Sequence, residues 1–338
     1  MEFFNMSDRR SVSIKDVARE AGVAISTASL ALNGGTRVAP ETLRRIRDAA
    51  AKLNYVGNSM ARRLKRGRSG VIGVMIFPGF NECHLDLAFL IQQEARKHGY
   101  DTRFFFEDML QHNDLGKFFG EINGQIDGLI SYSWPAMEQY QQFATMGIPC
   151  VFQERLNAEV DFVAIDFRTG ARLATEYLLE RGFRKIATFY TEKEISGQLP
   201  HERLHGYIDA MTAAGAEYKD LIVKLDGSPH SHEDLYKLGE QIMQTRPEAI
   251  FIRSDFAALT LLRVICDQGL VPGKDIAVVG FDNIRMGRYS NPSLTTIDYD
   301  QSWRARKMVE ILLARIKGES LPIQQCVSKC SLIKRESA

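Results

Sequence analysis

Residues Val12–Asn33 read VSIKDVAREAGVAISTASLALN, and their pattern sets the first helices of the chain. The apolar side chains of Ile14–Ala21 recur at helical spacing, so they share one face. Ser13 precedes them as an expected N-cap, with Asp16 three residues later, and Gly22 follows as an expected helix end. The stretch therefore predicts a short helix that stops at a tight turn.

A second helix is expected at Ile25–Leu32, where Asn33-Gly34-Gly35 ends it. A third starts at Pro40, a residue favoured at the first helical position, and runs to about Leu53. A helix, a turn containing glycine, a short helix and a third helix form the plan of the helix-turn-helix DNA-binding unit. From spacing alone, a small helical bundle that contacts no DNA remains the alternative.

A strongly basic segment follows at Asn58–Arg68, with five Lys and Arg residues around Leu64. It is too short to form a stable helix alone. One interpretation is a solvated linker. The other is a hinge that folds on DNA and inserts Leu64 into the minor groove.

The overall composition is that of an ordinary globular protein: of 338 residues, 45% are hydrophobic and 25% are charged. This length predicts two or three domains. No apolar run approaches the roughly 18 residues of a membrane helix, and the first residues lack the pattern of a signal peptide. The five scattered cysteines argue against a disulfide framework, so we expect a reducing cytoplasm.

The net charge of +1 is the sum of two opposite parts. Residues 1–70 contain 14 Lys and Arg residues but only six Asp and Glu residues, a net charge of +8, which leaves −7 for residues 71–338. A basic head on an acidic body predicts a polyanion-binding module joined to something else.

From Val71 onward the pattern changes to alternating strands and helices, which predicts doubly wound α/β subdomains with parallel sheets. Strands are expected at Val71–Phe77, Tyr100–Phe106, Gly128–Tyr132, Ile148–Phe152, Lys185–Tyr190, Leu221–Leu225, Ala249–Arg253 and Ile276–Phe281. Helices are expected at Leu85–His98, Gly170–Arg181, Glu202–Ala214, Glu233–Gln244 and Phe256–Gln268. Val163–Asp166 is interpreted as a link between two such series.

Ligands of parallel sheets bind at the carboxyl ends of the strands, so residues just past each strand form the candidate pocket. They combine carboxylates, an arginine and aromatic rings, groups that bind hydroxyls and cover the C–H face of a sugar. They are Phe77, Phe80, Tyr132, Trp134, Glu154, Asp166, Arg203, Ser254, Asp255, Asp282 and Asn283. Asp255 precedes a predicted helix, so N-capping is an alternative role for it.

The stretch Val12–Asn33 resembles the DNA-binding signature of the LacI family of bacterial transcription regulators. Leu53–Tyr55 and Asn58–Leu64 resemble that family's third-helix end and hinge helix. The resemblance covers nearly the whole chain. It implies a helix-turn-helix domain at 1–57, a hinge at 58–70 and an effector-binding and dimerisation domain at 71–338. The last domain is expected to resemble a periplasmic sugar-binding protein, with an N-subdomain at about 71–165 and 298–325 and a C-subdomain at about 166–297 and 326–338.

The resemblance also assigns DNA contacts. The family reads bases at the positions of Ile25, Ser26 and Leu30, and contacts the DNA backbone at those of Thr27, Ser29 and Asn33. The matched helix end and hinge add Tyr55, Asn58, Ala61 and Leu64. Leu30 stands where a family member has arginine, so it cannot hydrogen-bond guanine but is able to contact a thymine methyl group. Ala24 and Ala39 stand where Ser often caps the helices, which predicts a loosely stable head.

For the body, the resemblance implies three crossovers between the subdomains, near Asp166, Leu294–Asp298 and Ile323–Val327. Tetramers in the family use a leucine-heptad helix after the body. No heptads follow here, so we expect homodimers.

The resemblance favours Arg203 and Asp282 as ligand contacts, followed by Asp255 and Glu154. Purine-binding relatives carry a further arginine six residues before Arg203. Gly197 stands there in this chain, which disfavours a purine.

The favoured function is that of a cytoplasmic, homodimeric transcriptional repressor that binds a palindromic operator and responds to a sugar or sugar derivative. The alternative is a sugar-binding or transport protein without a DNA role. An enzyme is disfavoured, because the chain has neither a cofactor motif nor an ordered nucleophile. Cys326 and Cys330 are four residues apart, but nothing completes a zinc set, so no metal and no cofactor is expected.

Overall fold

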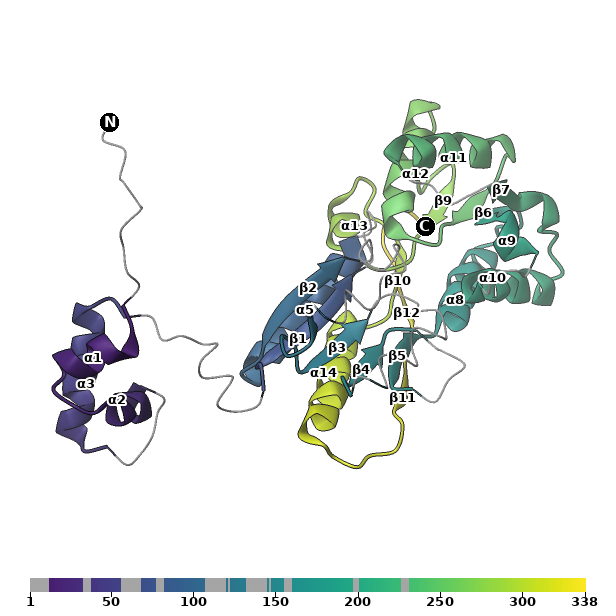
Figure 1. The fold of residues 1–338 in the computed structure, drawn as a ribbon. Helices are drawn as coiled ribbons and strands as arrows, with labels where there is room; N and C mark the ends of the chain where they lie inside the picture. The colour runs from purple at the N-terminus through teal and green to yellow at the C-terminus, as the bar shows by residue number, and fades with distance from the viewer. Residues whose placement is uncertain are drawn as a thin grey trace, which may run out of the picture. The chain divides into compact units, whose positions relative to one another are not determined.

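The computed structural model describes residues 12–32, 38–55, 68–76, 82–106, 120, 122–131, 145, 147–154, 160–196, 201–225 and 231–338. The chain forms two compact units, residues 1–69 and 70–338, which we name the head and the body (Figure 1). Each unit has hydrophobic cores of its own.

In its described part, the head consists of three helices, α1 (Ile14–Glu20), α2 (Ile25–Leu32) and α3 (Pro40–Lys52). Small side chains dominate their shared core and let these short helices pack closely: Val17, Ala18, Ala21, Ala28, Ala31, Ile46 and Ala49. The turn after α1 contains Gly22 with a φ of +61°, a conformation that suits glycine. The predicted helix-turn-helix fold is confirmed.

The ends of the head helices are held unequally. The Asp16 carboxylate accepts hydrogen bonds from the backbone N–H and the hydroxyl of Ser13, at 2.9 and 2.6 Å. Arg45 of α3 donates to the carbonyl oxygen of Ala21 at 2.8 Å and so satisfies the end of α1. Ala39 offers no side-chain cap to α3, as its sequence predicts.

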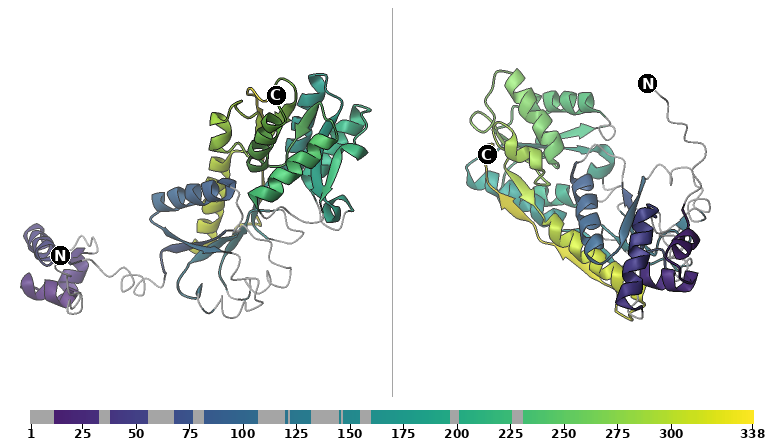
Figure 2. Two further views of the ribbon diagram at one scale, coloured as in Figure 1. Left: turned by 90° about the horizontal axis from the view of Figure 1, so that it is seen from above. Right: turned by 90° about the vertical axis from the view of Figure 1, so that its left-hand side faces the viewer.

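The body begins with a parallel sheet of six described strands in the order β11-β5-β4-β3-β1-β2. The strands are β1 (Val71–Ile76), β2 (Asp101–Phe106), β3 (Gly128–Ser131), β4 (Cys150–Phe152), β5 (Phe162–Ile165) and β11 (Gln325–Ser328). Helices α5 (Glu82–Lys97) and α14 (Gln301–Lys317) pack side by side on this sheet (Figure 2). β1 is buried along its whole length, which explains its unbroken run of apolar residues.

A second parallel sheet has the order β7-β6-β8-β9. Its strands are β6 (Ile186–Thr191), β7 (Ile222–Leu225), β8 (Ala249–Phe251) and β9 (Ala277–Val279). One face packs against α8 (Phe167–Glu180) and α10 (Glu202–Ala213), the other against α11 (His232–Gln244) and α12 (Asp255–Asp267). Three short helices connect these elements: α9 (Glu192–Ile195), η2 (Lys219–Leu221) and α13 (Arg285–Tyr289). The doubly wound fold class is confirmed.

Two sequence-based boundaries are wrong. The segment Val163–Asp166, interpreted as a link, is largely strand β5, which pairs with β4 and β11. The crossover expected at Ile323–Val327 lies later, because β11 stays paired with β5 as far as Ser328. Residues 326–328 therefore belong to the first sheet and not to the C-subdomain. An edge strand with an exposed residue such as Gln325 has a pattern that is easily mistaken for a linker.

After β11 the chain forms β12 (Ser331–Ile333), which pairs antiparallel with β10 (Thr296–Asp298). These two strands and the stretch after β5 carry the chain between its two sheets.

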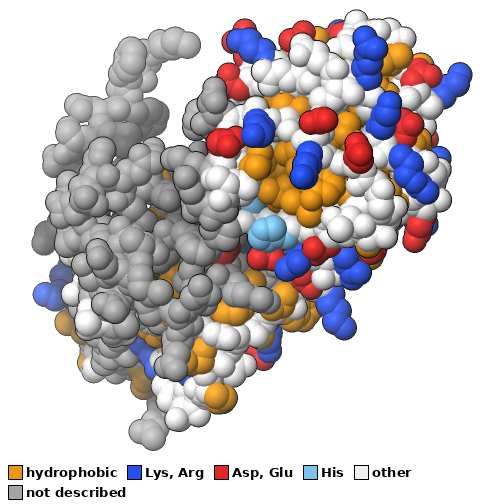
Figure 3. Space-filling view, turned by 90° about the vertical axis from the view of Figure 1, so that its right-hand side faces the viewer, with side chains coloured by type: hydrophobic (Ala, Val, Ile, Leu, Met, Phe, Trp, Pro, Cys, Tyr) orange, Lys and Arg blue, Asp and Glu red, His pale blue; other side chains and the backbone are white. Residues whose placement is uncertain are grey.

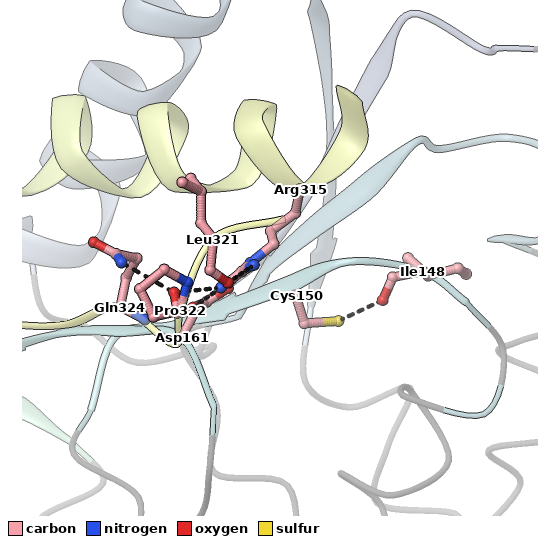
Figure 4. Close-up of polar contacts among 7 residues, drawn as sticks. All are labelled: Ile148, Cys150, Asp161, Arg315, Leu321, Pro322 and Gln324. Carbon is pink, nitrogen blue, oxygen red and sulfur yellow. Dashed lines mark hydrogen bonds and ion pairs between the residues drawn. The ribbon is translucent and has the colours of Figure 1, made fainter. Parts of the chain in front are cut away.

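A cluster of hydrogen bonds around Arg315 and Asp161, which we name the polar clip, holds the amino end of the edge strand β11 (Figure 4). Arg315 of α14 donates to both carboxylate oxygens of Asp161, at 2.7 and 3.0 Å. It also donates to the carbonyl oxygens of Leu321 and Pro322, at 2.6 and 2.8 Å. Asp161 accepts a further bond from the backbone N–H of Gln324 at 2.8 Å. The clip thus ties α14 to the residues that precede β5 and β11, at the edge opposite the carboxyl ends of the strands.

The surface of the body mixes charge types. On the side of the second sheet, Lys, Arg, Asp and Glu side chains alternate around hydrophobic ones (Figure 3). Within the described ranges, no helix is both long enough and apolar enough to cross a membrane. None of the five cysteines forms a disulfide. The described side chains also contain no cluster of His, Cys, Asp and Glu suited to a metal ion.

Candidate functional site

One side of α2 is exposed to solvent. Ala28 and Ala31 face the core of the head, whereas Ile25 and Leu30 are 48% and 42% exposed and Ser26 is exposed. Half-buried beside them are Thr27, Ser29 and Tyr55. Outside the described residues lie Asn33, Asn58, Ala61 and Leu64. The exposed side of α2 therefore presents two apolar side chains and one small polar side chain.

Three predicted residues of the body lie at the carboxyl edges of its two sheets. Glu154 follows β4, Arg203 lies in the first turn of α10, and Asp282 follows β9. The aromatic candidates lie outside the described residues: Phe77, Phe80, Tyr132 and Trp134.

Arg203 is held between two aromatic rings. The guanidinium carbon lies 3.7 Å from the ring centroid of Phe167 and 4.6 Å from that of Phe281, distances typical of cation–π contacts. Its Nε atom is buried and has no hydrogen-bond partner among the described residues. Buried donors are nearly always satisfied in proteins. This geometry leaves Arg203 able to donate to a ligand.

Asp282 is 5% exposed and has a φ of +118°. Its carboxylate accepts a hydrogen bond from the Tyr299 hydroxyl at 3.1 Å. It also lines a cavity of about 320 Å³ between α5 and the segment that joins β10 to α14. Cys83, Asp298 and Gln301 line the same cavity. Asp282 therefore lies where the two sheets' subdomains meet.

The positive charge of Arg203, a residue of the subdomain with the second sheet, affects the pKa of two groups in the subdomain with the first sheet. Burial raises the pKa of Glu154, and the positive charges of Arg203 and Arg304 oppose that rise. Burial, followed by the same two arginines, lowers the pKa of His84 to about 4. His84 is therefore neutral near pH 7. Glu154 and the two arginines, with the neutral imidazole of His84, form the constellation around Arg203.

Two predicted pocket residues make bonds within the fold. Asp166 caps α8, because its carboxylate accepts the backbone N–H of Thr169 at 3.1 Å. Asp255 is fully buried and accepts from the Thr296 hydroxyl at 2.6 Å and from the backbone N–H of Ile284 at 3.0 Å. The alternative role of Asp255, N-capping of α12, is filled by Ser254, whose side chain accepts the backbone N–H of Ala257.

Sequence reasoning missed Arg304. This α14 side chain is 1% exposed and donates to the carbonyl oxygens of Val163 and Gln153, at 3.3 and 3.4 Å. It also lies 5.6 Å from the Tyr299 ring centroid. The available signal was an arginine next to Ala305, on the face of α14 whose periodicity predicts burial.

The family model described as "Bacterial regulatory proteins, lacI family" matches residues 13–58, and the model "Periplasmic binding protein-like domain" matches residues 175–338. The HTH-type transcriptional repressor PurR of Actinobacillus pleuropneumoniae serotype 3 is 30% identical, over 92% of this chain and 93% of its own. The HTH-type transcriptional regulator CelR of Thermobifida fusca is 28% identical, over 98% of this chain and all of its own.

Among solved structures, a transcriptional regulator CelR–cellobiose complex superimposes with a TM-score of 0.69 at 26% identity, covering 97% of this chain and 100% of that one. The chain combines a helix-turn-helix head with a two-sheet α/β body, and its full-length relatives are regulators. These features define a DNA-binding transcriptional regulator and not an enzyme. The chain belongs to the LacI family of bacterial regulatory proteins.

Proposed function

We propose that this LacI-family member is a homodimeric repressor that acts in the bacterial cytoplasm. It binds a palindromic operator and is controlled by a sugar or sugar derivative held between the two subdomains of the body. The proposal unites three features: the exposed side of α2, the constellation around Arg203 and an apolar surface on the body.

The observation that carries the effector part is the state of Arg203. Its guanidinium is fixed by Phe167 and Phe281, yet its buried Nε–H has no acceptor among the described residues. A ligand oxygen supplies that acceptor, and Glu154 and Asp282 are carboxylates suited to accept from ligand hydroxyls. The cellobiose complex of the CelR regulator supports a sugar as the ligand class.

The operator part rests on α2. Ile25, Ser26 and Leu30 form its exposed side, and their chemistry suits thymine methyl groups and base edges better than guanine. The predicted contacts at Thr27, Ser29, Asn33 and Tyr55, and those of the hinge at Asn58, Ala61 and Leu64, complete the proposed DNA interface.

The dimer part rests on large apolar side chains left in solvent. Leu85 and Phe89 of α5 are 59% and 51% exposed, and Met286 and Tyr289 of α13 are 57% and 77% exposed. A 2.9 Å salt bridge from Arg285 to Asp86 joins the two helices. Exposed apolar groups gathered on adjacent helices are typical of a protein interface. We propose a second copy of the chain as the partner, because a two-fold dimer presents two heads to the two halves of a palindrome.

Ligand and operator are coupled through the angle between the subdomains. A ligand that touches both subdomains favours one angle, and the spacing of the two hinges changes with it. The ligand shifts operator affinity only by its differential affinity for the two states, typically about 1–3 kcal/mol.

Two measurements test the proposal. A thermal-shift screen with glucose, xylose, ribose, maltose and cellobiose should raise the melting temperature for at least one sugar, because a ligand stabilises the state that it binds. A gel shift with palindromes from upstream of the protein's own gene should then show binding that this sugar changes. Operator binding that no sugar alters would contradict the effector part and leave the DNA part intact.

A further inference from the structure

A second polar cluster lies beside Arg203, at the carboxyl ends of β6 and β8. It consists of Glu194, His201 and Arg253, whose side chains are only 10%, 14% and 21% exposed. Arg253 donates to Glu194 at 2.6 Å and lies 3.1 Å from Nε2 of His201. Nε2 of His201 is 3.2 Å from the same oxygen of Glu194. The three side chains therefore form a closed triangle.

Each side chain of the triangle is held from a second direction. The other carboxylate oxygen of Glu194 accepts from the backbone N–H and the hydroxyl of Thr191, at 2.7 and 2.9 Å. The His201 ring lies edge-on to Tyr190, with 4.8 Å between ring centroids. Arg253 lies over the ring of Phe189, 5.3 Å from its centroid. His201 is thus fixed in orientation before any ligand arrives.

The triangle uses only Nε2 of the His201 imidazole, so Nδ1 takes no part in it. Nδ1 of His201 is buried and has no hydrogen-bond partner among the described residues. Arg203, two residues further on, has a buried Nε in the same condition. Burial, then the charge of Arg253 and then that of Arg203 lower the pKa of His201 to about 3, so the imidazole is neutral near pH 7. Both unsatisfied atoms belong to the start of α10, which follows β6 in the chain.

We infer that His201 is a second effector-binding residue, which binds a hydroxyl group of the ligand through Nδ1 while Glu194 and Arg253 hold its ring in place. The inference rests on the proposed sugar effector. A neutral imidazole has one donor and one acceptor nitrogen, and the triangle occupies Nε2 in one of these roles. Nδ1 takes the other role. A hydroxyl group fits either tautomer because it both donates and accepts, whereas a carboxylate or phosphate only accepts.

A pair of substitutions separates ligand binding from structural support. His201→Gln places an amide near Nε2, so it keeps the triangle and loses the ligand contact. His201→Asn places an amide near Nδ1, so it keeps the ligand contact and loses the triangle. His205→Gln, at an exposed position on the same helix, is the matched control. Calorimetric titration with glucose, xylose, ribose, maltose and cellobiose gives Kd for each protein, and thermal unfolding gives Tm.

The Gln variant should keep its Tm and bind the recognised sugar about tenfold more weakly, which corresponds to one lost hydrogen bond. The Asn variant should have a lower Tm but a Kd within about threefold of the unsubstituted protein. A Gln variant that binds as tightly as the unsubstituted protein, or an Asn variant that binds as weakly as the Gln variant, would overturn the role of His201 and leave the sugar effector standing. If the unsubstituted protein binds none of these sugars, the proposed effector class fails, and this inference fails with it.

Discussion

At the scale of single residues, Asp255 is a buried carboxyl group whose surroundings in the fold disfavour its charged form. Burial, and then the nearby charge of Asp282, raise its pKa to about 8. The folded state binds this proton more tightly than the unfolded state does. The contribution of Asp255 to the free energy of unfolding is therefore complete below the unfolded pKa near 4 and is lost as the pH rises towards 8. The protein should therefore lose stability across this range.

The Asp255→Asn variant should not lose stability between about pH 4 and pH 8 in this way, because an amide does not titrate. The amide oxygen still accepts from Ile284 and its NH₂ group can donate to Thr296, so both bonds of the carboxyl group are replaced. We expect urea unfolding to show a variant that is more stable than the unsubstituted protein at pH 8, and an advantage that shrinks at pH 5. An advantage that is the same at both pH values would show that the group does not titrate between them.

Arg203 makes a prediction about the effector. Arg203→Ala removes the donor held between Phe167 and Phe281. We expect sugar affinity to fall by about ten- to a hundredfold, the loss typical of a hydrogen bond from a charged group. Calorimetric titration checks this, with Arg172→Ala on the exposed face of α8 as the control. Unchanged affinity would refute the pocket.

At the scale of elements, α8 and α10 pack so closely that one glycine is required. A Cβ atom added at Gly206 would lie 2.1 Å from the carbonyl oxygen of Arg168, an atom of the backbone that cannot rotate away. Gly206→Ala should therefore push the helices apart and cost about 1–3 kcal/mol of stability. Denaturant unfolding measures the loss, and His205→Ala on the exposed side of α10 is the control. A neutral effect would mean that the two helices are more loosely packed.

The third helix of the head makes the opposite kind of prediction. Ala39 precedes α3 in an extended conformation, with a ψ of 141°, but has no side chain able to cap it. Ala39→Ser should stabilise the head by about 1 kcal/mol, because the hydroxyl accepts a backbone N–H that α3 leaves unpaired. Amide exchange should show slower exchange in α3 and unchanged exchange in the body. Equal rates in both proteins would show that this helix start is not a weak point.

At the scale of the whole molecule, the proposed dimer depends on exposed apolar side chains of α5 and α13. Phe89→Glu places a charge on the proposed apolar surface, which also includes Leu85 of the same helix and Met286 and Tyr289 of α13, and burying that charge in an interface is costly. Sedimentation should show a shift from dimer to monomer, with weaker operator binding. Val271→Glu, at a residue that is 52% exposed and lies outside this surface, is the matched control. A variant that remains dimeric would place the interface elsewhere.

Much of the molecule was predictable because its signals are local. The helices of the head follow from spacing within about eight residues, and the strands of the body from short apolar runs. The rule that ligands bind past the carboxyl ends of strands selected Arg203, Asp282 and Glu154 without knowledge of the packing. The same rule selected Asp166 and Asp255, whose carboxyl groups accept hydrogen bonds from within the fold, because a carboxylate past a strand end equally suits such a bond.

The sequence by itself determined the helix-turn-helix head, the doubly wound body and the opposite charges of the two. Tertiary structure alone decided which buried polar groups are satisfied, because their partners are distant in the chain. Arg304 meets a carbonyl oxygen 141 residues away, Asp255 a hydroxyl 41 residues away, and Arg253 an imidazole 52 residues away. No local pattern encodes such pairs. They leave Arg203 and His201 with unsatisfied atoms among the described residues, and the proposed recognition of the effector follows from those atoms.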